Sequence, residues 1–264
     1  MKKVLVIGAH SYIGRKFKEY VSEIYNIDLT IDMVSASDGA WRLVDFSLYD
    51  VVLHLSGIVH RKEKRSMEAL YFEVNHILAV EIAMKAKDNK VKQFIFMSTA
   101  AVFGSQSGCI TKETLPNPTT YYGKSKLAAE QDIIKLQDSD YHVAIVRPPM
   151  IYGDGCKGNY PRLVKLAKLT PVFPEYHNKR SMLHIDNLSK YLVELIRNES
   201  GGYFHPQDAE YVDTCEMIVK IRKEMGKKTL LIHYLNNTLS FLVKNNVSVF
   251  QKMFGNLYFE KSLF

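Results

Sequence analysis

A tyrosine and a lysine stand four residues apart in the stretch Tyr-Tyr-Gly-Lys-Ser-Lys-Leu-Ala-Ala-Glu, which spans residues 121–130. Pro118 and the threonines after it indicate the start of a helix, and the following Ala, Leu, Glu and Lys residues favour its continuation. Residues four apart share one face of a helix, so Tyr122 and Lys126 point into the same space. A phenol with a pKa of about 10 is a poor acid or base at pH 7, and a nearby cation favours its phenolate. The pair is therefore a candidate for proton transfer, although the same spacing also arises by chance on ordinary exposed helices.

A glycine turn near the N-terminus supplies a second chemical signal. The apolar run Lys3–Ile7 is followed by Gly8, Ser11 and Gly14, and then by a helical pattern to about Tyr25. Strand, glycine turn and helix in this order form the context of a dinucleotide-binding motif, in which the helix N-terminus faces a phosphate. Ser11 replaces the middle glycine of the usual pattern, and its small side chain can itself donate a hydrogen bond.

The candidate residues of both motifs must be positioned by a common scaffold, and the pattern of apolar residues predicts a β-sheet. Further buried strands are expected at 29–36, 51–55, 94–97 and 142–146, and long helices at 67–87 and 121–137. Strands that alternate with helices imply an α/β fold, a Rossmann-like, doubly wound parallel sheet. Ligands bind beyond the carboxyl ends of the strands in such sheets. Four candidate residues lie at these ends: Gly8, Ser56, Thr99 and Arg147.

The second half of the chain has a looser pattern, rich in glycine and proline. Short elements are expected there at 161–169, 186–198, 203–204 and 213–225. We predict an NAD(P)-type nucleotide-binding domain over 1–150, to which 176–200 returns, and a smaller substrate-binding lobe over 151–264. The apolar tail from Leu235 to Phe264 is expected to pack on this lobe or on a second subunit, and a membrane-surface helix is the alternative.

Composition excludes several classes of function. The 264 residues are 47% apolar and 24% charged, as in ordinary soluble proteins. No apolar run is long enough to span a membrane, and the first run ends in a glycine turn without a cleavage site. We therefore predict a cytoplasmic protein with no integral membrane segment.

The net charge of +7 raises the question of nucleic-acid binding. The basic residues are scattered, however, and the densest cluster, at 60–65, is interpreted as a solvated loop, so no nucleic-acid partner is predicted. Cys109, Cys156 and Cys215 lack the spacing of a metal or redox site, and no metal is predicted.

In combination, the motifs resemble the extended short-chain dehydrogenase/reductases, the nucleotide-sugar epimerase/dehydratase group. The resemblance spans Val4 to Asp186. It is carried by Gly8…Ser11…Gly14, Asp45, His54-Leu55-Ser56-Gly57, Asn75, Ser98-Thr99-Ala-Ala-Val-Phe-Gly104, Tyr122-Gly-Lys-Ser-Lys126, Arg147-Pro148…Tyr152-Gly153 and Arg180…His184-Ile-Asp186. The chain departs from the family pattern at Ser11, at Ser56-Gly57 and at Phe103, and none of these changes removes a proton-transfer group.

The resemblance implies a role for each candidate residue. Thr99 would hydrogen-bond the sugar oxygen, Tyr122 would be the acid/base, and Lys126 would bind the nicotinamide ribose and lower the tyrosine's pKa. The implied cofactor-binding residues are Gly8, Ser11, Tyr12, Ile13 and Gly14 at the pyrophosphate, Asp45 and Phe46 at the adenine, and Leu55, Ser56, Gly57, Asn75, Tyr122, Lys126, Arg147 and Pro148.

Three residues are implied substrate contacts. Arg180 would face the diphosphate of a nucleotide sugar, a task that suits a bidentate guanidinium; the alternative is a surface salt bridge. His60 and Asn159 are further candidates, and the alternative for each is a polar loop residue.

The cofactor is expected to be NAD(P). An acidic residue at the end of the second strand favours NAD, whereas small and basic residues favour NADP. Ser37 and Asp38 both lie near that end, and Arg15 and Arg42 are within possible reach, so both forms stay open.

A narrower likeness is to the capsule and O-antigen subgroup. The segments 93–99, 143–153 and 158–162 look like those of reductases of UDP-4-keto-6-deoxy-N-acetylhexosamines. The resemblance implies reduction of the C4 ketone of a UDP-linked sugar for surface polysaccharide. The alternatives are a UDP-glucose or UDP-N-acetylglucosamine 4-epimerase and, from another class, a non-catalytic nucleotide-binding scaffold. A homodimer through the helices at 67–87 and 121–137 is also implied.

Overall fold

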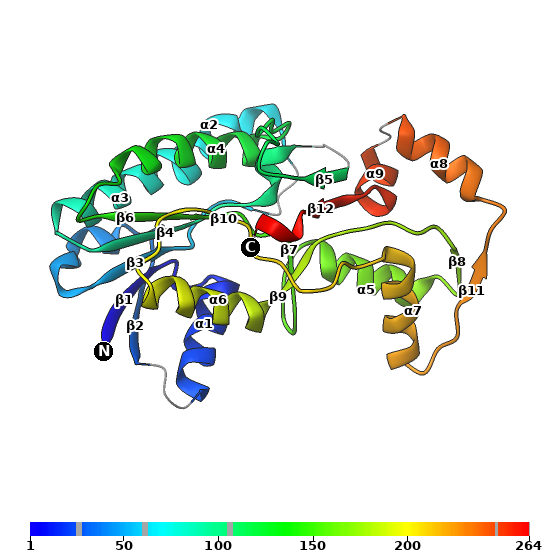
Figure 1. The fold of residues 1–264 in the computed structure, drawn as a ribbon, viewed down its shortest axis with the longest axis horizontal. Helices are drawn as coiled ribbons and strands as arrows, with labels where there is room; N and C mark the ends of the chain where they lie inside the picture. Colours follow the sequence, from blue (N-terminus) through cyan, green and yellow to red (C-terminus); the bar gives the residue numbers. More distant parts are fainter. Residues whose placement is uncertain (25–27, 60–62, 105–107, 246–247, 264) are drawn as a thin grey trace.

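A six-stranded sheet forms the centre of the larger lobe in the computed structural model, which describes residues 1–24, 28–59, 63–104, 108–245 and 248–263 (Figure 1). Its strands are all parallel and follow the order β10-β6-β4-β3-β1-β2. Their bounds are β1 Lys2–Ile7, β2 Leu29–Val34, β3 Val51–His54, β4 Gln93–Met97, β6 His142–Val146 and β10 Gly202–Phe204. The predicted α/β fold with a doubly wound parallel sheet is therefore confirmed.

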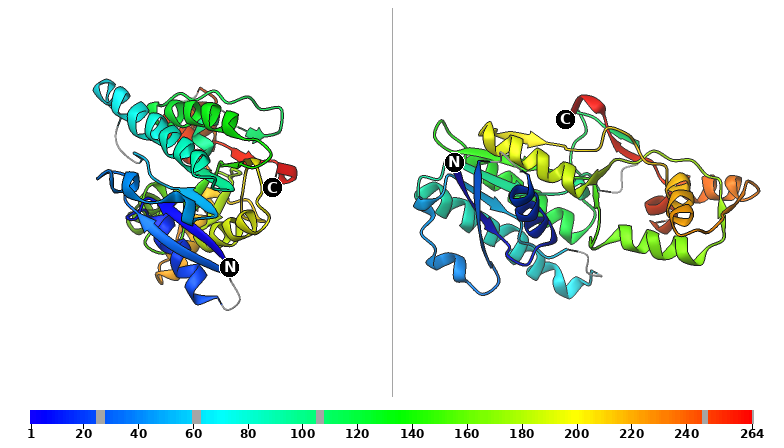
Figure 2. Two further views of the ribbon diagram at one scale, coloured as in Figure 1. Left: turned by 90° about the vertical axis from the view of Figure 1, so that its left-hand side faces the viewer. Right: turned by 90° about the horizontal axis from the view of Figure 1, so that it is seen from below.

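Helices cover both faces of the sheet, as Figure 2 shows. One face carries α2 (Glu68–Phe72), α3 (Leu78–Asp88) and α4 (Tyr121–Ile133), and the other carries α1 (Tyr12–Glu23) and α6 (Ile185–Arg197). Alternate residues of β1 enter separate cores: Leu5 and Ile7 pack on the side of α3 and α4, whereas Val4 and Val6 pack on the side of α1 and α6. Because both faces of the sheet are buried, the strand sequences are continuous apolar runs.

The long helix predicted at 67–87 is not a single α-helix. Between α2 and α3 the chain makes a π-helical turn, Glu73–Ile77, in which backbone hydrogen bonds span five residues instead of the four of an α-helix. The helix predicted at 121–137 ends as α4 at Ile133 and continues as a 3₁₀ turn. The 3₁₀ turns lie at Ala40–Leu43, Phe46–Leu48, Arg65–Met67, Ala100–Phe103, Ile134–Leu136 and Lys261–Leu263.

The smaller lobe has its own apolar core. It is built from α5 (Asn159–Leu169), α7 (Thr214–Glu224), α8 (Asn236–Lys244), α9 (Ser248–Phe254) and the parallel pair β8 (Val172–Pro174) and β11 (Leu230–Ile232). Phe173, Ile218, Leu239 and Phe254 are buried together there. The described part of the apolar tail therefore packs on this lobe. No helix among the described residues is long and apolar enough to cross a membrane.

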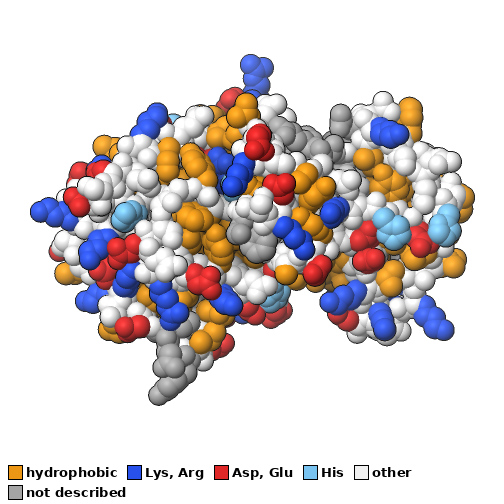
Figure 3. All heavy atoms as spheres, in the orientation of Figure 1, with side chains coloured by type: hydrophobic (Ala, Val, Ile, Leu, Met, Phe, Trp, Pro, Cys, Tyr) orange, Lys and Arg blue, Asp and Glu red, His pale blue; other side chains and the backbone are white. Residues whose placement is uncertain are grey.

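Two further strand pairs link distant segments between the lobes. β7 (Met150–Tyr152) pairs with β9 (Met182–His184), and β5 (Gly108–Ile110) pairs with β12 (Leu257–Phe259). Phe259 is buried against Phe103, so the end of the tail also contacts the larger lobe. In the space-filling view of Figure 3, the two lobes join across a narrower waist.

Candidate active site

Helix α4 carries the candidate acid/base, and two side chains cap its first turn. The Thr120 hydroxyl accepts a hydrogen bond from the Gly123 amide at 3.0 Å. The Glu63 carboxylate accepts one from the Tyr121 amide and one from the Tyr122 amide, both at 3.0 Å. A carboxylate is favourable at this positive end of a helix. Glu63 thus fixes the start of the helix that positions Tyr122.

Thr99 and Tyr122 are brought together by β4 and α4. Thr99 is the second residue after β4, and its side chain hydrogen-bonds the Tyr122 side chain. Burial raises the pKa of Tyr122 to about 12, and the Thr99 hydrogen bond opposes this shift without cancelling it. The phenol is therefore protonated at neutral pH and is poised to donate a proton.

Lys126 lies one turn along α4 and is only 4% exposed. Its ammonium donates to the Met97 carbonyl at 2.9 Å and lies 4.4 Å from the centre of the Phe96 ring. Burial lowers the pKa of Lys126 to about 8, and the Glu130 carboxylate opposes that shift. The expected lowering of the Tyr122 pKa by Lys126 is not seen, because burial dominates at the phenol and the ammonium binds the strand end.

Asn75 joins the end of β3 to α4 from within the π-helical turn. Its side chain is fully buried, accepts from the Ile58 amide at 2.7 Å and donates to the Ile58 carbonyl at 3.1 Å. It also donates to the Ser125 hydroxyl at 3.2 Å. A methyl group added at Gly57 would lie 2.9 Å from the Asn75 amide oxygen and 3.5 Å from the Lys126 ammonium. Glycine at 57 thus leaves room for this close approach.

The N-terminal glycine turn forms a cradle at the ends of β1 and β3. Gly8 has a φ of +125°, and an added methyl group would lie 3.2 Å from the Ser56 amide nitrogen. Ser11 caps α1 by accepting from the Gly14 amide at 3.0 Å, and a methyl group at Gly14 would lie 2.9 Å from Met33. The bare strand ends and the capped helix N-terminus fit a dinucleotide pyrophosphate.

Replacing Gly8 by Ala is expected to destabilise the protein and to weaken dinucleotide binding. Gly108→Ala is a matched control, because Gly108 also has a positive φ of +114° but an added methyl group there meets nothing within 4 Å. Both changes carry the backbone cost of a positive φ, about 1–2 kcal/mol. Gly8→Ala should lose about 1–3 kcal/mol more through overpacking. Urea unfolding and an NADH fluorescence titration measure the two effects; equal results for both variants would contradict the close approach.

The side chains of three predicted cofactor residues are already engaged within the protein. Phe46 is fully buried in the core beside Trp41, so only its backbone is available to a nucleotide. Asp45 accepts hydrogen bonds from the amide and hydroxyl of Ser47, which hold the pKa of its carboxyl below the usual value. Arg147 is paired with a buried glutamate, Glu130, at 2.6 Å.

The other predicted cofactor residues lie around the cradle or at the neighbouring strand ends. Tyr12 begins α1 and donates to the Asp154 carbonyl at 3.0 Å; burial raises its pKa to about 12. Ile13 and Leu55 pack against the core on the side of α1. The buried Pro148 accepts from the Ala100 amide at 2.9 Å, beside Thr99.

The residues near the end of β2 make contacts of their own. Asp38 accepts from the Ala40 amide at 3.0 Å. Arg42 pairs with Glu81 at 3.0 Å and stacks 4.5 Å from the centre of the Trp41 ring. The Arg42 guanidinium is thus already engaged, whereas Arg15 is exposed.

Two of the three predicted substrate residues, Arg180 and Asn159, lie within the described residues. Arg180 donates to the Gly255 carbonyl at 2.9 Å and lines a small cavity of about 50 Å³ together with Ala100, the neighbour of Thr99. Burial lowers the pKa of its guanidinium. Asn159 is exposed at the first residue of α5, and His60 lies outside the described residues.

A larger hollow of about 1080 Å³ lies between α5, α7 and the loop after β7. Its lining includes Tyr152, Tyr160, Lys165 and Lys220, but none of Thr99, Tyr122 and Lys126. The three candidate residues are therefore not part of this hollow. Within the described residues no cluster of His, Cys, Asp or Glu side chains is suited to hold a metal ion.

Sequence reasoning missed two acidic residues of the site. Glu130 lies four residues after Lys126, so it shares the helix face of Tyr122 and Lys126, and this spacing could have identified it. Glu63 is 59 residues from Tyr122 in sequence and follows a run of mixed charges, so no local pattern pointed to it.

Comparisons with known proteins agree with this geometry. Residues 4–205 match the family described as the NAD dependent epimerase/dehydratase family. A UDP-glucose 4-epimerase of Vibrio cholerae is 34% identical over 190 residues, which are 68% of this chain and 58% of that protein. An N-acetyl-alpha-D-glucosaminyl-diphospho-ditrans,octacis-undecaprenol 4-epimerase of Escherichia coli O157:H7 is 24% identical over 274 residues, 97% of this chain and 82% of that protein.

A solved structure shows the same fold. A dTDP-4-dehydrorhamnose reductase from Bacillus anthracis, in complex with NADP, superposes with a TM-score of 0.72 at 20% identity. The superposition covers 88% of this chain and 84% of that one. The family match covers most of the larger lobe, including the cradle, Thr99, Tyr122 and Lys126. The chain therefore belongs to the NAD dependent epimerase/dehydratase family.

Proposed function

We propose that the protein is a nucleotide-sugar oxidoreductase that acts at C4 of a UDP-linked sugar. The observation that carries the proposal is the hydrogen-bonded pair of Thr99 and Tyr122 at the end of β4, with Lys126 one helical turn away. Glycines keep the neighbouring ends of β1 and β3 bare for a dinucleotide. When bound, the nicotinamide supplies or accepts the hydride.

The proton is handled by the chain's own side chains. Tyr122 is protonated at neutral pH, because burial raises its pKa to about 12, so it can give its proton to a C4 oxygen that gains negative charge. Thr99 hydrogen-bonds the same oxygen and orients it. The positively charged Lys126 ammonium lies next to the site, where it donates a hydrogen bond to the Met97 carbonyl.

The leading candidate is a 4-ketosugar reductase. In this reaction the C4 carbonyl of a UDP-4-keto-6-deoxy-N-acetylhexosamine gains a hydride at carbon and the Tyr122 proton at oxygen, which gives the C4 alcohol. A phenol that rests in its protonated state is suited to this direction. The product would be a 6-deoxy sugar for surface polysaccharide.

The second candidate is a 4-epimerase, and the names of both curated relatives favour it. Epimerisation would use the same side chains twice. This direction needs Tyr122 to start as the phenolate: it would first accept the proton of the C4 hydroxyl and then return it, and the ketone would stay bound while its other face is reduced. The two candidates therefore differ in whether the ketone is taken up from solution or formed within the site.

One experiment separates the two. The purified protein is mixed with NADH or NADPH and UDP-4-keto-6-deoxy-N-acetylglucosamine generated in situ, and the absorbance at 340 nm is followed. A loss of absorbance that requires the ketosugar supports the reductase. Interconversion of UDP-glucose or UDP-N-acetylglucosamine epimers without added reductant, detected by chromatography, supports the epimerase. Activity in neither assay would contradict the proposed action on UDP-linked sugars.

We also propose that two copies associate through the helices that cover the α4 face of the sheet. Leu70 on α2, Ile77 in the π-helical turn and Met84 on α3 are 38%, 51% and 49% exposed. They recur every seven residues, about two helical turns, and exposed apolar side chains that gather in this way mark interaction surfaces. The family resemblance points to the same helices.

Ile77→Lys is expected to convert a dimer into a monomer, because it places a charge in the apolar interface. Light scattering coupled to size-exclusion chromatography measures the mass. Leu43→Lys is the matched control, since Leu43 is 92% exposed on a 3₁₀ turn outside these helices, and it should leave the mass unchanged. A wild-type protein that elutes as a monomer, or an Ile77→Lys variant that stays a dimer, would exclude this interface.

A further inference from the structure

Three consecutive residues at the end of β4 are each bonded to a different side chain of α4. The Met97 carbonyl accepts from the Lys126 ammonium at 2.9 Å, the Ser98 hydroxyl donates to the Glu130 carboxylate, and Thr99 hydrogen-bonds Tyr122. Two of these contacts involve the proposed catalytic groups directly. The third, between Ser98 and Glu130, lies between them and has no role yet in the chemistry.

Glu130 is fully buried and is held by an arginine from a second strand end. Arg147 directly follows β6 and is 8% exposed. Its Nε donates to both carboxylate oxygens of Glu130 at 3.1 Å, and its Nη2 donates to one of them at 2.6 Å. Such a bidentate pair fixes orientation as well as charge.

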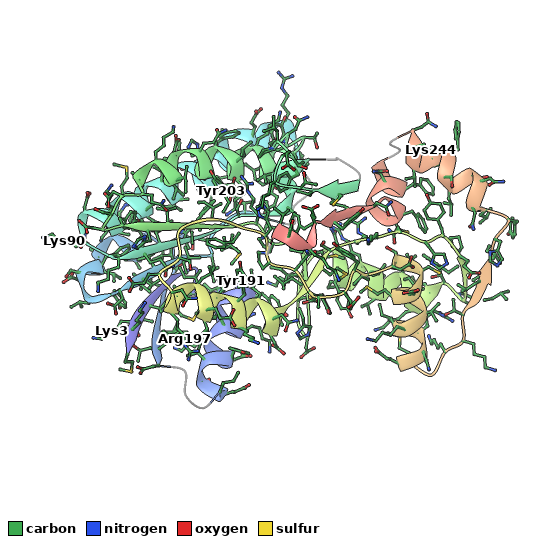
Figure 4. All side chains as sticks on the ribbon, in the orientation of Figure 1. Lys3, Lys90, Tyr191, Arg197, Tyr203 and Lys244 are labelled. Carbon is green, nitrogen blue, oxygen red and sulfur yellow. The ribbon has the colours of Figure 1, made fainter. Side chains whose placement is uncertain are left out.

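Aromatic rings enclose the arginine. The guanidinium carbon of Arg147 lies 5.2 Å from the Phe103 ring centre and 4.4 Å from the ring centre of Tyr203. Tyr203 is labelled in Figure 4 and belongs to β10, at the edge of the sheet. The network thus connects α4 to the ends of β4 and β6 through side chains that are themselves buried: Ser98, Glu130 and Arg147.

We propose that Glu130 is a positioning residue of the active site, which holds the end of β4 through Ser98 and the end of β6 through Arg147 and so keeps Thr99 and Lys126 in register with Tyr122. The proposal rests on the proposed function, because it assigns Glu130 to the same proton transfer. Glu130 itself does not touch the reacting atoms. Its effect on the reaction is therefore expected in the rate of turnover rather than in the binding of substrate.

Glu130 should also set the charge state of Lys126. The titratable groups that face Lys126 are Tyr122 and Glu130 from α4 and His54 from β3, and Arg147 from β6 faces it through Glu130. Burial holds the pKa of His54 at about 3 and raises that of Tyr122, so both are neutral at pH 7. Glu130 is the anion that opposes the loss of the Lys126 proton.

The test compares Glu130→Gln with wild type. The amide keeps the shape of the carboxylate but not its charge, so kcat should fall by about a hundredfold, the loss that a small misplacement of reacting groups produces. KM for the sugar should change little. The decline of kcat at alkaline pH should move to lower pH, because Lys126 would lose its proton more easily. Glu130→Asp retains the charge and should restore the position of that decline in part.

Two further variants separate positioning from loss of folding. Ser98→Ala removes one hydroxyl and leaves the Glu130–Arg147 pair, so kcat should fall while the pH profile stays in place. Glu81→Gln is the matched control, because it breaks the exposed pair with Arg42 and should change neither quantity. The proposal is overturned if Glu130→Gln turns over at the wild-type rate. It is equally overturned if kcat falls only in proportion to the folded fraction, with the pH profile unmoved.

Hydrogen–deuterium exchange gives a readout that does not depend on the sugar. The backbone at 97–104 should exchange faster in Glu130→Gln than in wild type and in Glu81→Gln. If the wild type turns over neither sugar, the proposed function fails, and exchange then still decides whether Glu130 holds this strand end. Unchanged exchange would refute the positioning role even in an active enzyme.

Discussion

Tyr122→Phe is expected to lower the turnover of the UDP-sugar substrate by roughly 10²–10⁴-fold, the usual contribution of a general acid or base. Phenylalanine retains the ring of this partly buried residue but lacks the hydroxyl that bonds Thr99 and carries the proton. Binding of NAD(P)H should fall far less than turnover, because most of the predicted cofactor contacts lie in the cradle at the ends of β1 and β3. Steady-state kinetics and a fluorescence titration of the cofactor measure the two quantities.

Tyr121→Phe is the matched control for this change. Tyr121 is the neighbouring tyrosine on the same helix and lies one residue out of register with Lys126, so loss of its hydroxyl should leave turnover close to wild type. Full activity in Tyr122→Phe, or an equal loss in both variants, would rule out Tyr122 as the proton carrier.

Lys126→Met is expected to abolish turnover and yet stabilise the fold at neutral pH. Burial lowers the pKa of Lys126 from 10.5 to about 8, so keeping the folded ammonium charged costs about 3 kcal/mol. Methionine removes this cost and retains much of the apolar stem. The variant also loses the hydrogen bond to the Met97 carbonyl, which cancels about 1 kcal/mol of that gain. The free energy of unfolding should therefore rise by about 2 kcal/mol.

The stability gain of Lys126→Met over wild type should shrink as the pH rises. Because the folded-state pKa of Lys126 lies below its unfolded value, the unfolded chain holds the extra proton between about pH 8 and 10.5. In that interval the stability of wild type rises with pH relative to the methionine variant, so the difference is constant below pH 8 and shrinks above it. Because turnover requires the charged Lys126 ammonium, the turnover rate of wild type should also fall as the pH rises from about 8 to 10.5.

Urea unfolding at several pH values measures this difference. Lys124→Met serves as the control, because Lys124 is exposed on the same helix and should show no pH-dependent difference from wild type. A Lys126→Met variant that is less stable than wild type at pH 7 would refute the account of a costly buried charge.

The elements that position the site were predictable because their signals are local. The apolar and helical segments predicted over 1–150 follow from residue periodicity, and the register of Tyr122 and Lys126 follows from helix geometry. Thr120 caps α4 where the threonines indicated a helix start. Parallel pairing of the strands followed from their alternation with helices.

The parts that were missed depend on contacts between distant residues. β5, β7, β8, β9, β11 and β12 have three residues each, too few to show an alternating pattern, and each exists only because it pairs with a segment far away in sequence. The family resemblance implies a cofactor contact for Arg147, and its partner within the protein was not predicted. Its pairing with Glu130 became visible only when β6 and α4 were placed side by side.

The π-helical turn at 73–77 limits how this segment of the chain can change in length. It presents Asn75, fully buried, to the site and Ile77, 51% exposed, to the outer surface. An α-helix turns by about 100° per residue, so deleting one residue there would rotate α2 against α3 by about that angle. After such a deletion, no rotation of the helices could keep Asn75 facing the site and Ile77 facing the outer surface at the same time. Substitutions can alter either surface separately, whereas a deletion or insertion of one residue would disturb both together.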